Sequence, residues 1–178
     1  MQVNYFEFYG LEPALTLDAG KVRQIYLEKS RQYHPDYHTQ ATEAEQEKAL
    51  ELSSLNNEAY KTLSNPDKLL GYVLQQQGLL SEEAGNEKMP QAFLMEMMEI
   101  NEALMELEFD PDPNAVEKAT KQIEEIENNL EDTIKNIRNN WTVDSGNTKD
   151  LESVKEYFLK KKYLLRVKEK LSTFATAF

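Results

Sequence analysis

The stretch SRQYHPDYH, residues 30–38, closes a charged helical pattern and opens a polar loop. Pro35 disfavours helical geometry in the residue before it, so the preceding helix is predicted to stop at Tyr33 or His34. Two histidines, an aspartate and two tyrosines within this stretch suit a metal site, a catalytic site or a polar turn. The surrounding sequence distinguishes these three possibilities.

A metal or catalytic role for this stretch is disfavoured by its spacing. His34 and His38 are the only histidines of the chain, and Pro35 between them prevents a shared helical face. The chain has no cysteine, which excludes disulfides, cysteine-ligated zinc and thiol nucleophiles. It also contains no recognisable Ser-His-Asp set and no glycine-rich phosphate loop. We therefore predict no metal, no cofactor and no enzymatic activity.

The charge of the chain is acidic overall but unevenly distributed. A net charge of −12 argues against a general affinity for nucleic acid, whose phosphates it would repel. Residues 18–33 nevertheless carry 4 basic and 2 acidic side chains, and residues 149–170 carry 8 and 4. Such basic segments are either solvated helix faces or local docking surfaces for an acidic partner.

The N-terminal stretch MQVNYFEFYGL lacks the basic region and the apolar run of a signal peptide. No apolar stretch of the sequence approaches the roughly 20 residues that cross a bilayer. The expected location is therefore cytoplasmic, without a membrane partner.

Helical spacing of apolar residues runs through the chain and predicts an all-α protein. The first part is expected to contain helices near residues 4–11, 18–33, 42–63 and 66–77. Thr16 or Asp18 would cap the second of these helices, and Thr42 with Glu45 forms a capping box for the third. Glycine, proline and charged residues at 78–90 predict a linker between a unit at 1–77 and a unit at 91–178.

The unit after the linker is predicted to be an antiparallel three-helix bundle, with helices at 91–108, 113–141 and 148–174. Each helix carries apolar residues three and four apart, which would face a common core. The first helix has Phe93, Met97, Ile100, Leu104 and Leu107, the second has Val116, Ala119, Ile123, Ile126, Leu130, Ile137 and Trp141, and the third has Leu151, Val154, Tyr157, Leu164, Val167, Leu171 and Phe174.

A second apolar stripe on residues 91–108 lies roughly 100° around the helix from the core seam. It is either part of a wide core-facing surface or an adaptable docking surface, because flexible methionines fit variable partners. The stripe consists of Leu94, Met98 and Met105, with Met95 beyond it and Glu99, Glu102 and Glu106 at its border.

The last helix also carries apolar residues outside its main seam. Leu151, Phe158 and Leu165 recur at seven-residue spacing, one position away from the line of Tyr157 and Leu164. For Leu151 and Leu165 we predict a place in the core of the bundle.

The tripeptide His34–Pro35–Asp36 is informative because of the helices on either side of it. It joins a helix with several basic residues to a helix that ends NNEAYKTLSNPDK, residues 56–68. This arrangement resembles the J-domain of DnaJ-type co-chaperones. The segments YFEFYGLEP (5–13), NPDKLLGYVLQQQG (65–78) and above all AFLMEMMEINEALMELE (92–108) are similar to the HscB type, and the resemblance covers nearly the whole chain.

The resemblance implies a fold and a function. HscB-type proteins couple an N-terminal J-domain, here residues 1–77, to a C-terminal three-helix bundle, here residues 91–178. They deliver an IscU-type iron–sulfur scaffold protein to a DnaK-type, HscA-like chaperone and stimulate its ATPase. The alternative is a general J-domain co-chaperone whose bundle binds unfolded clients.

The resemblance also implies contact residues for each partner. The implied chaperone contacts are His34, Pro35 and Asp36 with the basic residues Lys21, Arg23, Lys29 and Arg31. The implied scaffold contacts are Leu94, Met95, Met98, Glu99, Glu102, Glu106 and Phe158.

Three positions depart from the family pattern. Asn101 stands where bacterial members often have an arginine, which removes one expected polar contact to the scaffold. Lys29 occupies a position that is usually apolar, which predicts looser packing near the end of its helix. Tyr37 follows Asp36 where many J-domains have a lysine.

Overall fold

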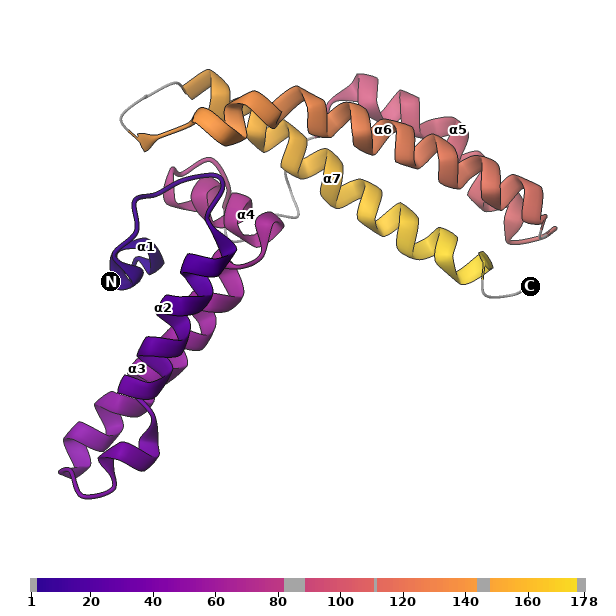
Figure 1. The fold of residues 1–178 in the computed structure, drawn as a ribbon. Coiled ribbons are helices and arrows are strands. Elements are labelled where there is room, and N and C mark those ends of the chain that lie inside the picture. The colour runs from indigo at the N-terminus through magenta and orange to yellow at the C-terminus, as the bar shows by residue number, and fades with distance from the viewer. Residues whose placement is uncertain (1–2, 82–88, 111, 144–147, 176–178) are drawn as a thin grey trace. The chain divides into compact units, whose positions relative to one another are not determined.

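The computed structural model describes residues 3–81, 89–110, 112–143 and 148–175. Within these ranges it contains seven α-helices, one short 3-10 helix and no β-strand, which confirms the all-α prediction (Figure 1). None of the described helices combines the length and the apolar character needed to cross a bilayer. Most of the linker predicted at 78–90 lies outside the described ranges.

The chain folds as two compact units. The first unit is Met1–Gln77 with Trp141–Gly146, and the second is Gly78–Asn140 with Asn147–Phe178. The first unit contains α1 (Tyr5–Tyr9), α2 (Ala19–Gln32), η1 (Pro35–His38), α3 (Glu43–Leu63) and α4 (Pro66–Gln76). The second contains α5 (Gln91–Leu107), α6 (Pro113–Asn140) and α7 (Thr148–Ala175).

The helices α2 and α3 lie side by side as an antiparallel hairpin (Figure 1). Asp18 caps α2, because its carboxylate accepts a hydrogen bond from the Lys21 backbone N–H at 2.9 Å. At the start of α3 the Glu45 carboxylate accepts from the backbone N–H of Thr42 at 2.9 Å, so the predicted capping box is confirmed. The segment predicted as a plain polar loop after α2 instead contains η1, which Pro35 begins because its fixed φ suits a first helical position.

A buried polar residue, Asn56 of α3, ties the hairpin together. Its Nδ2 donates to the backbone oxygen of Tyr26 at 3.1 Å and to the Ser30 hydroxyl at 3.0 Å, both on α2. Its Oδ1 accepts from the Tyr9 hydroxyl of α1 at 2.8 Å. Burial raises the pKa of Tyr9, so that hydroxyl stays a donor. One amide therefore fixes the positions of α1 and α2 on α3.

The core of the second unit matches the predicted seams in most positions. The prediction failed at three places in the longer helices. Ile134 of α6 and Leu159 of α7 are buried although neither was assigned to a seam, and Leu165 of α7 is 42% exposed although we predicted it in the core. The predicted seam residues of α5 and α7 that share one buried cluster are Phe93, Met97, Ile100, Leu104, Leu107, Leu164, Val167 and Leu171.

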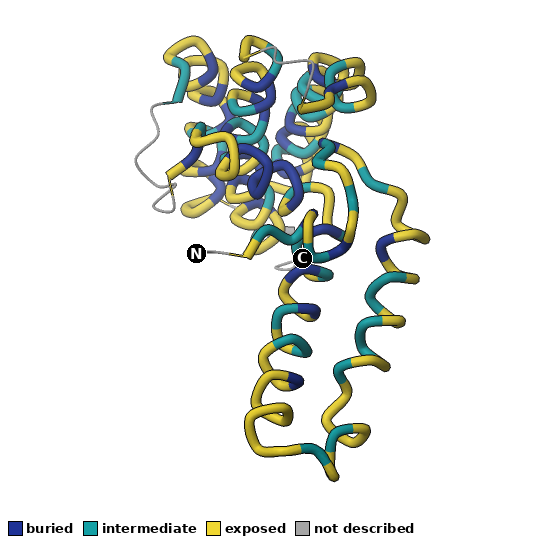
Figure 2. Tube along the Cα trace, turned by 90° about the vertical axis from the view of Figure 1, so that its left-hand side faces the viewer, coloured by how far each residue is buried: buried dark blue, intermediate teal, exposed yellow. Residues whose placement is uncertain are grey.

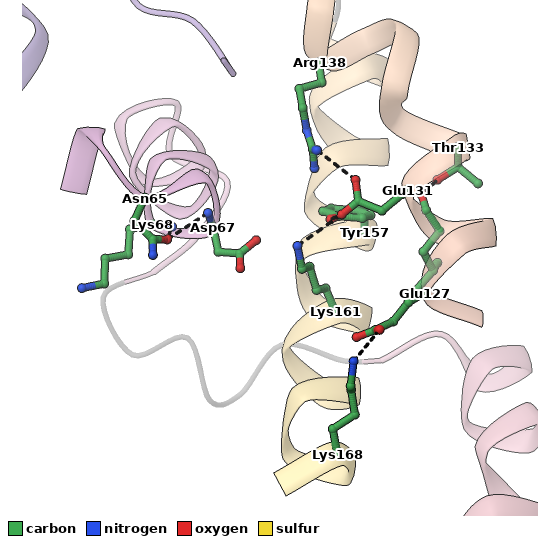
Figure 3. Close-up of polar contacts among 11 residues, drawn as sticks. Asn65, Asp67, Lys68, Glu127, Glu131, Thr133, Arg138, Tyr157, Lys161 and Lys168 are labelled. Carbon is green, nitrogen blue, oxygen red and sulfur yellow. Dashed lines mark hydrogen bonds and ion pairs between the residues drawn. The ribbon is translucent and has the colours of Figure 1, made fainter. Parts of the chain in front are cut away.

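Polar contacts join α6 to α7 along one side of the bundle (Figure 3). The Glu131 carboxylate accepts from the Tyr157 hydroxyl, from Lys161 at 3.2 Å and from Arg138 at 2.8 Å. Burial alone would raise the pKa of Glu131, but the hydrogen bonds from Tyr157 and Lys161, together with the positive charges of Arg138 and Lys161, outweigh it and lower that pKa. Two turns away Lys168 of α7 pairs with Glu127 of α6 at 2.7 Å.

Candidate functional site

The first candidate surface is the tip of the α2–α3 hairpin. His34, Pro35 and Asp36 are all exposed there, and the tip is mostly exposed in the burial colouring of Figure 2. The chain turns between α2 and α3 at this tip, so no other element of the first unit covers these three residues. An exposed, stiffened loop of this kind presents side chains and backbone to another protein.

Within the tip, His34 is the N-terminal cap of η1. Its Nδ1 accepts a hydrogen bond from the Asp36 backbone N–H at 3.2 Å, and the Asp36 Oδ2 lies 3.7 Å from the same nitrogen. An accepting Nδ1 implies the tautomer that carries its proton on Nε2. The exposed His34 ring therefore keeps an Nε2–H donor, two residues from the exposed Asp36 carboxylate.

His38 has a different task in the same loop. Its Nε2 lies 3.0 Å from the backbone oxygen of Gln32, the last residue of α2. The ring thus satisfies a carbonyl at the helix end and links η1 back to α2. Among the described residues no group of three or more His, Asp or Glu side chains is arranged to hold a metal ion.

The basic residues of α2 differ in solvent exposure and in their contacts with aromatic rings. Lys21, Arg23 and Arg31 are exposed. Lys29 is half-buried, and its Nζ lies 4.3 Å from the centre of the Phe8 ring and 5.8 Å from that of Tyr33. The ammonium of Lys29 is therefore held in a cation–π contact that fills the position predicted to pack loosely.

The second candidate surface is the outward side of α5, called here the α5 patch. Its apolar members are 44% (Leu94), 67% (Met95), 58% (Met98) and 59% (Met105) exposed. Within the second unit these side chains do not belong to the core, so the docking-surface interpretation of the stripe is favoured over a wide core face. Exposed glutamates border the patch at Glu99, Glu102 and Glu106.

The departure at Asn101 has a structural explanation. The Asn101 Nδ2 donates to the Tyr163 hydroxyl of α7 at 2.8 Å. Asn101 follows Met98 by three positions and precedes Met105 by four, so it lies between them on the same helical face. Its amide consequently anchors the middle of the patch to α7, a role that the sequence did not reveal.

Phe158, the remaining scaffold contact implied by resemblance, is not brought together with the α5 patch. Three α7 residues make specific contacts with α5: Lys160 and Tyr163 with Phe93, Tyr163 also with Asn101, and Lys170 with Glu108. At 100° per residue Phe158 lies roughly 140° around α7 from Tyr163 but only about 60° from Lys161, which contacts α6. Phe158 therefore lies on a side of α7 that points away from α5.

Comparison with family models and curated sequences finds consistent relatives. Residues 89–172 match the family described as the HSCB C-terminal oligomerisation domain. The chain is 31% identical over 126 residues to the co-chaperone protein HscB homolog of Neisseria meningitidis serogroup A, covering 71% of this chain and 76% of the relative. It is 31% identical over 169 residues to the human iron-sulfur cluster co-chaperone protein HscB, covering 94% and 67%.

Solved structures extend the likeness to the fold of nearly the whole chain. The crystal structure of human co-chaperone protein HscB superimposes with a TM-score of 0.75 and 25% identity, over 99% of this chain and 84% of that one. The chaperone HscB from Vibrio cholerae has the same fold, with a TM-score of 0.72 and 22% identity, over 98% and 99%.

Proposed function

The chain belongs to the HscB co-chaperone family, and on that premise we propose that it carries an IscU-type iron–sulfur scaffold protein to a DnaK-type, HscA-like chaperone. The chain would stimulate the ATPase of that chaperone without performing chemistry itself. The observation that supports this most directly is that each unit has an exposed surface of its own. One is the tip around His34 and Asp36, and the other is the α5 patch.

The tip has the properties of a contact for a basic and polar site on the chaperone. The Asp36 carboxylate is exposed and can accept charge-assisted hydrogen bonds from an arginine of the partner. The Nε2–H of the exposed His34 ring offers a donor in the same loop. Binding energy gained at this tip would favour the chaperone conformation that hydrolyses ATP, which is how a partner accelerates a reaction without a catalytic group.

The exposed cations of α2 support the same contact through long-range attraction. Lys21, Arg23 and Arg31 present positive charge to solvent, while the chain as a whole carries −12. An acidic chaperone surface would be steered to this helix rather than to the remainder of the protein. Added salt would weaken that attraction.

The α5 patch has the properties of a contact for a compact protein with an apolar surface bordered by cations. Exposed methionines adapt to the shape of such a surface, and Leu94 supplies a stiffer apolar contact. The glutamate border would pair with lysine or arginine around the edge of the scaffold.

A reconstituted ATPase assay tests the proposal. ATP turnover by the chaperone should rise further with this chain and the scaffold together than with either one alone. His34→Gln should remove the stimulation and leave scaffold binding, measured by calorimetry, unchanged. His38→Gln is the matched control, since the same chemical change falls on a ring that bonds Gln32 within the loop. Full stimulation by His34→Gln contradicts the assignment of the tip.

The alternative is a general J-domain co-chaperone whose bundle binds unfolded clients, and affinity capture separates the two. Enrichment of one small scaffold protein, lost when Leu94 and Met98 are both changed to alanine, supports the dedicated function. Capture of many unrelated unfolded chains, equally strong with the double variant, supports the general function instead.

A further inference from the structure

The methionines of α5 fall into two classes that differ in access to solvent. Met97 is fully buried, whereas Met95, Met98 and Met105 are 67%, 58% and 59% exposed. Resting on the proposed scaffold contact, we propose that these three exposed methionines are a site of reversible oxidation to methionine sulfoxide. Their oxidation lowers the affinity of the α5 patch for the scaffold and so releases it.

Among the described residues, the thioethers of the patch are the sulfur atoms most accessible to an oxidant. The chain has no cysteine, so the thioethers of its 6 methionines are its only sulfur atoms. Of the methionines that the structure describes outside the patch, Met97 is buried and Met89 is half-buried against the core. Oxidation therefore concentrates at the patch.

The oxidant that fits the site is a neutral peroxide. Carboxylates at Glu99, Glu102 and Glu106 border the three thioethers and disfavour the approach of anionic oxidants within a distance of about 8 Å at physiological salt. Hydrogen peroxide and organic hydroperoxides carry no charge and are not repelled.

The reaction is an oxygen-atom transfer. A sulfur lone pair attacks one oxygen of the peroxide, the O–O bond breaks and an S–O bond forms. The sulfur loses two electrons, and the second oxygen leaves as water, or as an alcohol from an organic hydroperoxide, after proton transfer. Methionine sulfoxide reductases restore the thioether with electrons from a thiol donor, so the change is reversible.

The consequence follows from the position of the sulfurs. Sulfoxide formation places a strong hydrogen-bond acceptor on side chains that would be buried against the apolar surface of the scaffold. An acceptor buried without a donor opposes binding, so a single sulfoxide at the centre of the contact weakens the affinity about tenfold. The fold itself is unaffected, because the oxidised side chains face solvent in the free protein.

The test oxidises the full chain alone with graded hydrogen peroxide and removes the peroxide before the scaffold is added. Peptide mass spectrometry should show an added oxygen at Met95, Met98 and Met105 before Met97. Calorimetry should then show at least about tenfold weaker scaffold binding, with an unchanged thermal unfolding midpoint. Treatment with both epimer-specific sulfoxide reductases should restore the affinity.

The variant Met95→Leu/Met98→Leu/Met105→Leu keeps apolar side chains that cannot be oxidised and serves as the matched control. Whatever affinity this variant has for the scaffold before peroxide, the treatment should leave that affinity unchanged. Wild-type binding that is unchanged by complete oxidation of the three residues overturns the inference, as does an equal loss in the leucine variant. Failure of the untreated protein to bind the scaffold contradicts the proposed function instead, so the two failures are distinguishable.

Discussion

The Nδ1 atom of His34 accepts the backbone N–H of Asp36 at 3.2 Å, so the histidine positions the aspartate two residues later. This contact gives His34 two separable features, an Nδ1 acceptor that caps η1 and an Nε2–H donor that the cap does not use. A partner could depend on either one.

Two substitutions of His34 separate these features. His34→Asn keeps a short side-chain acceptor where Nδ1 lies, so it should preserve the cap, while His34→Gln loses the cap geometry. If the chaperone contacts Nε2–H, both variants should reduce ATPase stimulation by at least tenfold in a single-turnover assay. Stimulation that survives in His34→Asn alone would show that His34 acts only by positioning Asp36.

Substitutions within the α5 patch should weaken scaffold binding more than a substitution at Phe158. Leu94→Ala/Met98→Ala removes apolar contacts from the centre of the patch, which we expect to weaken scaffold binding by about 2–3 kcal/mol in calorimetry. Phe158→Ala should change the affinity by less than about 0.5 kcal/mol, because Phe158 lies on the side of α7 that points away from α5. An equal loss in both variants would place the scaffold contact on a different surface.

Exposed Arg31 and half-buried Lys29 of α2 should differ in what their substitution changes: chaperone binding for Arg31, and stability for Lys29. Arg31→Gln should weaken chaperone binding in a salt-dependent manner and leave the unfolding free energy unchanged, because Arg31 is exposed. Lys29→Gln should instead lower the unfolding free energy by about 0.5–1 kcal/mol, because it loses the contact with Phe8. Urea unfolding and binding measured at two salt concentrations distinguish these outcomes.

The amide of Asn56 should be costly to remove. Asn56→Leu leaves the buried Tyr9 hydroxyl without its side-chain acceptor, and the Ser30 hydroxyl loses the Asn56 amide as its donor, so we expect the first unit to lose about 2–3 kcal/mol of unfolding free energy. Asn57→Ala is the control, since Asn57 accepts only an exposed hydrogen bond from Tyr26. Comparable losses in the two variants in urea unfolding would contradict the importance of the buried amide.

The lowered pKa of Glu131 predicts a pH dependence of stability. Its pKa is 4.5 in the unfolded reference and lower in the folded protein, so ionised Glu131 stabilises the fold above pH 4.5. That contribution is lost as the pH falls from 4.5 through the folded pKa, because the unfolded state takes up the proton first.

Glu131→Gln measures this contribution directly. At neutral pH the variant should be about 1 kcal/mol less stable than the wild type, a modest value because the pair is partly exposed. The difference should shrink below pH 4.5 in urea unfolding. Glu125→Gln, an exposed position on the same helix, should show neither effect. A difference that is constant with pH would contradict the role of the carboxylate charge.

Much of the fold was predictable because the helical spacing of apolar residues indicates which residues share one face of a helix. The spacing of Phe93, Met97 and Ile100 gave the buried seam of α5, and Pro35 gave the end of α2. The spacing does not indicate against which other helix that face packs. The seven-residue spacing of Phe158 was therefore visible in sequence, but its placement away from α5 could be inferred only from the contacts that Tyr163 of α7 makes with α5.

The candidate sites show the same limit. Resemblance supplied the residues of the tip, but the roles of His34 as a cap and of His38 as a partner of Gln32 depend on backbone positions after Pro35. The anchoring of Asn101 by Tyr163 joins residues 62 positions apart, and no local pattern signals such a pair.

The hydrogen bond from Asn101 to Tyr163 also determines which degrees of freedom docking removes. The helix α5 is already formed and is hydrogen-bonded to α7 through Asn101. Binding of a partner therefore does not have to order the backbone of α5. The conformational entropy lost on docking is then mainly that of the exposed methionine torsions. Because methionine side chains change rotamer easily, the same rigid helix can fit partners whose surfaces differ slightly in shape without refolding.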